Sequence, residues 1–174
     1  ASVSEAIGTV YSSDNWDEVT WEIASNYTFE NGMTGYATIQ SGYQSGQYPA
    51  RPYCLFGDIE CFVASDNITA VNYEVGIKGR VNEYFDVSVA VFNTDFDDLP
   101  YQVSKVTENG FETDNQIVTQ TSRGIELDTT FNYGNFSMMA SVGYMDVDVD
   151  EQDGYKPVAP LTPDLTLAIG PSYT

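Results

Sequence analysis

Along most of the chain, apolar and polar residues alternate with a period of two. Between positions 19 and 29 the odd residues are mostly apolar and include Val19, Trp21 and Ile23, whereas the even residues include Glu22 and Asn26. Successive side chains of a β-strand point to opposite faces, so the pattern predicts strands with one apolar and one polar face. It recurs along the chain and predicts seven strands, at about residues 17–29, 33–45, 71–81, 85–97, 119–132, 136–147 and 164–174.

The connections between these predicted strands are alternately short and long. Residues 30–32, 82–84 and 134–135 form tight turns rich in Gly and Asn. The intervening connections, at about 45–70, 98–118 and 147–163, are long. Short turns at one end and long loops at the other are typical of an outer-membrane barrel. Pro171 has no N–H for the ladder, so we expect it to weaken the last strand or to mark a bulge.

Alternation alone does not separate a membrane barrel from a soluble β-sandwich, because both cover one face of their strands. The chain has no run of 18 apolar residues, as a transmembrane helix would need, but barrel strands need only about 9–11 residues each. The predicted strands exceed the usual five or six residues. Their aromatic residues cluster near the strand ends, where barrels carry aromatic girdles. These features favour the membrane barrel.

Composition narrows the class of partner. The chain carries 26 acidic and 6 basic residues, a net charge of −20, and no His. Such a charge argues against nucleic acid, because phosphates need a Lys/Arg surface. The 13 Tyr and 9 Phe supply enough apolar surface for a folded domain rather than a disordered one.

Several motifs resemble the strands of TonB-dependent receptor barrels. Residues 72–79 (NYEVGIKG) resemble the YEVGxK strand opening of that family. Residues 89–99 (VAVFNTDFDDL) are similar to its AxFxTDYDDL strand, and 122–127 (SRGIEL) to its RGVELE strand. Residues 42–46 (GYQSG) resemble GYKSGG, with Gln44 in place of the usual Lys, and the motifs at 143–146 and 167–174 continue in the family's order.

This resemblance implies an all-β fold: an antiparallel transmembrane β-barrel segment, with about seven strands of a larger barrel of about 22 strands. Residues 1–174 would form part of one receptor β-barrel in the bacterial cell outer membrane. On this resemblance, we expect the plug domain and the closing C-terminal strands of such receptors to be absent from this chain. We therefore expect the chain to be a portion of a larger protein, because an open sheet edge is not tolerated in lipid.

By the same resemblance, the function would be uptake of a scarce solute: a ferric siderophore, haem, cobalamin or an oligosaccharide. The partners would be outer-membrane lipid, the TonB complex through the plug, and a small-molecule or oligosaccharide ligand. Aromatic residues of the long loops can stack on the ligand or simply order the loops. The candidate ligand-loop residues are Tyr48, Tyr53, Phe56, Tyr101 and Tyr155. The alternatives are a passive porin-like channel and a soluble glycan-binding β-sandwich.

Two further groups of residues raise chemical hypotheses. Cys54 and Cys61 are close in sequence, and a disulfide between them fits an oxidising compartment, although two free thiols are the alternative. In an extended strand Asp146, Asp148 and Asp150 share one face, and carboxylate oxygens suit Ca²⁺. The favoured interpretation of these three is a solvated strand extension, with calcium binding as the weaker alternative.

Nothing in the sequence indicates catalysis or a cofactor. The chain has no His and no serine-nucleophile motif. Adjacent carboxylates such as Asp97 and Asp98 point to opposite faces of a strand, so they do not form the facing pair that a glycosidase uses. We predict that the chain is not an enzyme.

Overall fold

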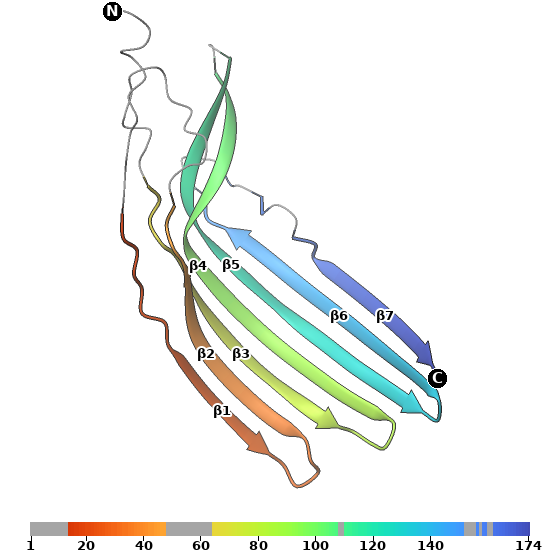
Figure 1. Ribbon diagram of the computed structural model, residues 1–174. Coiled ribbons are helices and arrows are strands. Elements are labelled where there is room, and N and C mark those ends of the chain that lie inside the picture. The colour runs from red at the N-terminus through yellow and green to blue at the C-terminus, as the bar shows by residue number, and fades with distance from the viewer. Residues whose placement is uncertain (1–13, 48–63, 108–109, 152–155, 157, 160–161) are drawn as a thin grey trace, which may run out of the picture.

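The described part of the chain is a single antiparallel sheet. A computed structural model describes residues 14–47, 64–107, 110–151, 156, 158–159 and 162–174, and only the backbone of 102–107 and 110–115. Neighbouring strands in the chain are neighbours in the sheet (Figure 1). In chain order they are β1 (Glu22–Thr28), β2 (Thr34–Gln44), β3 (Ile68–Arg80), β4 (Phe85–Thr107), β5 (Gly110–Tyr133), β6 (Phe136–Val149) and β7 (Leu165–Tyr173). The all-β prediction is therefore confirmed. Within the described ranges, no helix is long and apolar enough to cross a membrane.

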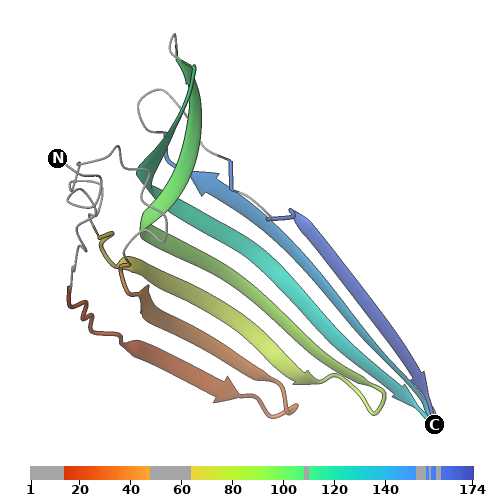
Figure 2. The same cartoon turned by 45° about the horizontal axis from the view of Figure 1, so that its top comes forward.

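The sheet is curved, and its two ends differ (Figures 1 and 2). At one end, which we call the turn end, short turns join β1 to β2, β3 to β4 and β5 to β6. Gly32 and Gly134 take positive φ angles of 82° and 56° in two of these turns, a conformation that glycine adopts without strain. In the third turn the Asn82 side chain accepts hydrogen bonds from the backbone N–H groups of Tyr84 (2.9 Å) and Phe85 (3.1 Å). All three turns lie where the sequence predicts them.

At the other end, β4 and β5 run on beyond their neighbours as a two-stranded ribbon (Figures 1 and 2). The register shifts between Phe96 and Leu99, and pairing then resumes with Leu99 opposite Val118 and continues to Thr107 opposite Gly110. We call this the ribbon end. The prediction of a loop over 98–118 is therefore wrong, and Tyr101 lies in a strand rather than in a loop.

The residues that suggested a loop are accommodated by the ribbon's free edges. Asp98 sits in the bulge with a φ of 62°, which is rare for a residue other than glycine. Pro100 lacks an N–H, but beyond the Thr69–Asp97 pair no described strand lies beside β4 on the β3 side, and an edge strand tolerates proline. Pro171 is accommodated in the same way in β7, the last described strand, where the register shows no bulge.

One face of the sheet is apolar across its strands, and we call it the apolar face. Ile125 is 46% exposed and Leu165 64%, and in the described residues the buried hydrophobic side chains are limited to Ala90, Val118 and Val149. No part of the chain that the structure describes forms a layer over this face, which argues against a β-sandwich and is what contact with lipid requires. On β3 to β7 the centre of the apolar face consists of two rows of residues that pair across the strands. The first row is Val75, Val91, Ile125, Tyr144 and Leu165, and the second is Ile77, Val89, Leu127, Val142 and Leu167.

Aromatic side chains gather at the turn end. The ring of Phe131 has its centroid 4.8 Å from that of Phe85 and 6.2 Å from that of Phe136. The rings of Tyr84 and Tyr133 are 5.5 Å apart. Membrane barrels carry such girdles at the level of the lipid headgroups. The predicted clustering of aromatic residues near strand ends is thus confirmed at this end of the sheet.

A charge on the apolar face should oppose membrane assembly. We expect Ile125→Arg in the full-length protein to reduce the folded fraction by the equivalent of roughly 2–4 kcal/mol, the cost of Arg near the middle of a bilayer. The matched control is Thr130→Arg on the opposite face of the same strand, next to a hollow that Asp86 and Asp128 also line. Heat-modifiable mobility on gels measures the folded fraction. Greater damage from Thr130→Arg than from Ile125→Arg would mean that the two faces are reversed.

Candidate functional site

The opposite face, which we call the polar face, is hollowed near the middle of β2 to β5. The hollow has a volume of about 410 Å³. Its lining combines two carboxylates, Glu74 and Glu126, with uncharged hydrogen-bonding side chains such as Gln40, Asn72 and Thr94. We call it the inner hollow. A polar, hollowed face opposite an apolar one is what the wall of a water-filled or plugged barrel presents to its lumen.

On the polar face, two aromatic rings lie over glycines on neighbouring strands, and one of them, Phe92, lines the inner hollow. Tyr36 pairs with Gly76, and a Cβ at Gly76 would come within 2.6 Å of the tyrosine ring. Phe92 pairs with Gly124, where a Cβ would approach its ring to 2.8 Å. Because these glycines carry no side chain, the rings lie low against the sheet, as in other cross-strand aromatic–glycine pairs.

Hydrogen bonding and charge hold one side of the hollow. The Tyr36 hydroxyl donates to Glu74 Oε1 at 2.7 Å, and Lys78 Nζ lies 5.2 Å from the centroid of the Tyr36 ring, within cation–π range. Glu74 is opposite Phe92, and Glu126 is opposite Ala90, two residues before Phe92 on β4. Across the part of the chain that the structure describes, Glu126 has neither a hydrogen bond nor an ion pair. One carboxylate of the hollow is therefore free to bind a cationic group.

Towards the ribbon end, the polar face carries Tyr101, one of the predicted ligand residues. Its hydroxyl donates to Gln120 Oε1 at 2.6 Å, and the Gln120 amide nitrogen donates to Ser122 Oγ at 3.2 Å. Burial raises the pKa of the Tyr101 hydroxyl, so the phenol stays neutral and keeps its proton as a donor. Tyr101 is thus part of an ordered polar network rather than of a loop.

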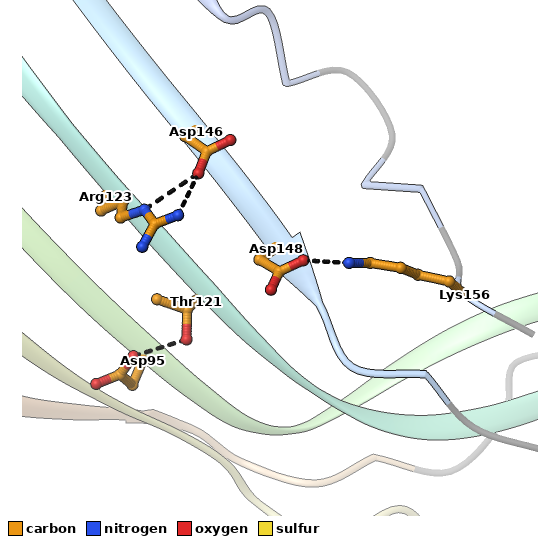
Figure 3. Close-up of polar contacts among 6 residues, drawn as sticks. All are labelled: Asp95, Thr121, Arg123, Asp146, Asp148 and Lys156. Atoms are coloured by element: carbon orange, nitrogen blue, oxygen red, sulfur yellow. Dashed lines mark hydrogen bonds and ion pairs between the residues drawn. The ribbon is translucent and has the colours of Figure 1, made fainter.

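The apolar face ends, near the ribbon end, in a group of charged side chains (Figure 3). Arg123 on β5 donates to Asp146 on β6 through Nε (3.1 Å) and one terminal nitrogen (2.9 Å). Lys156 pairs with Asp148, and this contact lowers the pKa of the Asp148 carboxyl and raises that of the lysine. Thr121 donates to Asp95 at 2.8 Å. Charged groups here are compatible with the headgroup region, where charge costs far less than at mid-bilayer.

These contacts bear on the calcium hypothesis for Asp146, Asp148 and Asp150. The first two do share a face of β6, as predicted, but each is paired with a basic side chain, and β6 ends before Asp150. Among the described residues, no group of three or more His, Cys, Asp or Glu side chains is arranged to hold a metal ion. The geometry therefore lends calcium binding no support.

The remaining predicted site residues lie outside the described residues. The disulfide and the loop contacts stay predictions; they concern Cys54, Cys61, Tyr48, Tyr53, Phe56 and Tyr155. In the sequence, Glu74 and Glu126 alternate with apolar neighbours such as Val75 and Ile125, but the pattern does not show that the two carboxylates lie close together. The register shows that they do, because it places Glu74 on β3 and Glu126 on β5, on either side of β4.

Comparison with known proteins agrees with this architecture, which is a wall segment of a transmembrane β-barrel. The family model described as "TonB dependent receptor-like, beta-barrel" matches residues 2–174. The chain therefore belongs to the TonB-dependent receptor β-barrel family, as its motifs predict. Members of this family are transporters rather than enzymes, and the family implies a bacterial outer membrane.

Among solved structures the chain is similar to one named "Copper transporter OprC", with a TM-score of 0.55 and 15% sequence identity. The match covers 72% of this chain and 20% of OprC, so the chain spans about a fifth of the length of that protein. At this identity the likeness concerns the fold alone. No curated protein matches the sequence.

The glycine beneath Phe92 should be intolerant of any side chain. A Cβ at Gly124 would meet the backbone oxygen of Tyr144 as well as the Phe92 ring, so backbone would have to move. We expect Gly124→Ala to destabilise the full-length receptor by about 1–3 kcal/mol, the usual cost of overpacking. Gly42→Ala is the control, because nothing lies within 4 Å of a Cβ there. The temperature at which the folded gel band disappears measures the effect, and equal melting of the two variants would contradict the packing described above.

Proposed function

We propose that this chain forms part of the barrel of an outer-membrane receptor that imports a scarce solute with energy delivered by TonB. The observation that carries the proposal is the match of the family model to residues 2–174. The described sheet supports it with one lipid-compatible and one hollowed polar face. Further strands of the same protein would close the barrel. In the described sheet β1 and β7 each pair on one side only, and such edges require partners in hydrocarbon.

A plug domain encoded elsewhere in the same protein would fill the lumen against the polar face. The inner hollow supports this idea because it offers Glu126 without a charge partner and Glu74 with only a phenol. A carboxylate removed from bulk water is costly unless a cation pairs with it. We therefore propose that Lys or Arg side chains of the plug bind these two glutamates.

Two measurements on the purified full-length receptor test energised uptake without knowledge of the solute. The receptor should capture the soluble C-terminal domain of TonB, and in planar bilayers it should be closed to ions because the plug blocks the lumen. A passive channel would conduct continuously and would ignore TonB. Steady conductance without TonB capture would overturn the proposal.

The two glutamates should hold the plug in place. We expect the double substitution Glu74→Gln and Glu126→Gln to raise the frequency of conducting events at least about tenfold, which corresponds to roughly 1.4 kcal/mol. The charge-matched control removes Asp95 and Asp97 as Asn, since these carboxylates are on the opposite face of β4. Bilayer recordings compare the two proteins. Equal conductance would show that Glu74 and Glu126 do not anchor the plug.

A further inference from the structure

We propose that the polar face at the base of the ribbon binds an uncharged, hydroxyl-rich solute of the carbohydrate class. The inference rests on the proposed function and specifies its substrate class. Six side chains of β3, β4 and β5 carry it, and we call them the neutral track: Asn72, Thr94, Tyr101, Gln116, Gln120 and Ser122.

The neutral track is continuous because the register aligns its members on one face. On β5, positions 116, 120 and 122 have the same parity as Glu126 in the inner hollow. Ser122 is opposite Thr94, and Thr94 is opposite Asn72, to which its hydroxyl donates at 2.8 Å. Together with the bonds that link Tyr101, Gln120 and Ser122, these contacts form a path of amides and hydroxyls that leads from the ribbon to the inner hollow.

Among the residues of the neutral track, Gln116 gives the strongest indication that a ligand binds here. Its side chain is only 6% exposed, and neither its amide nitrogen nor its amide oxygen has a hydrogen-bond partner within the described residues. A buried amide without partners is unfavourable, and native proteins satisfy nearly all such groups. The amide offers two donors and an acceptor beside the apolar Val118 and opposite Tyr101. Hydroxyls that alternate with C–H groups on a sugar ring match this combination.

The ribbon provides a route to the buried amide. Beyond Asp97 on β4 and Gln120 on β5, the described strands β3 and β6 no longer pair with the ribbon. Within the described residues, therefore, no strand flanks the ribbon on either side. A displacement of the ribbon at the bulge would expose Gln116 and would leave the pairing of the sheet below it intact.

The distribution of charge argues against an anionic solute such as a ferric catecholate. Among the residues whose side chains the structure describes, the basic ones are Lys78 and Arg80 near the turn end, Arg123 on the apolar face, and Lys156, which is paired with Asp148. Lys105 lies further out on the ribbon, where β4 pairs it with the acidic Glu112. None of them belongs to the neutral track. An anion entering at this end would also meet repulsion from the carboxylates there, whereas an uncharged solute would not.

Binding to the purified full-length receptor in detergent tests the inference. The neutral probes are malto-, cello-, xylo-, laminari- and chito-oligosaccharides, and the charged probes are a ferric catecholate, ferric citrate and Cu²⁺. We expect calorimetry to detect binding of at least one neutral series and of no charged probe. Gln116→Leu should lower the affinity for that series at least about tenfold. It should leave the melting temperature of the free receptor unchanged or raised, because it removes an unpaired amide.

Thr121→Val is the matched control, since Thr121 is on the same strand but on the opposite face, and it should leave affinity unchanged. Gln116→Met replaces Gln116→Leu if the latter does not assemble. Binding of none of the neutral series, binding of a charged probe alone, or an unchanged affinity in the Gln116 variant overturns the inference. TonB capture by the same preparations separates the two proposals: if capture persists while sugars fail to bind, only the substrate class is wrong.

Discussion

The need to satisfy every backbone hydrogen bond within hydrocarbon governs the rest of this structure. Lipid offers no donor or acceptor, so a strand that crosses it must pair on both sides. The described chain meets this need by the simplest route for β2 to β6, which each pair with the strand before and the strand after, while β1 and β7 pair on one side only. Consequently the register is fixed along the whole sheet, and with the register every side chain is assigned to one of two faces.

Those two faces meet different solvents, and the same strand serves both. On β5, Ile125 and Leu127 belong to the apolar face, while Glu126 between them lines the inner hollow. The polar face is further shaped by glycines, since Gly76 and Gly124 let the rings of Tyr36 and Phe92 lie flat. The pairing that satisfies the backbone hydrogen bonds therefore also places the carboxylates of the inner hollow on the polar face.

The sequence predicts the strand order, the turns and the parity of the faces because each depends on local residue type. Alternation marks the strands, and Gly and Asn mark the turns at Gly32 and Gly134. Prediction from the sequence fails at residues 98–118, where Asp98 and Pro100 suggest a loop. In the structure, a bulge accommodates Asp98 and the free edge of the ribbon accommodates Pro100. Prediction from the sequence also fails to bring Glu74 and Glu126 together or to show that Gln116 is buried, because these facts depend on pairing between strands and on packing.

The strictly sequential strand order also has a consequence for how the protein is made. Every pair of neighbouring described strands is also adjacent along the chain. Bringing two such strands together therefore closes a loop of limited length and costs little conformational entropy. Each finished hairpin leaves one unpaired edge, and that edge is the template on which the next hairpin aligns. The sheet can therefore grow outward hairpin by hairpin from a seed, and at each stage the number of backbone groups that still need a partner stays constant while the wall becomes wider.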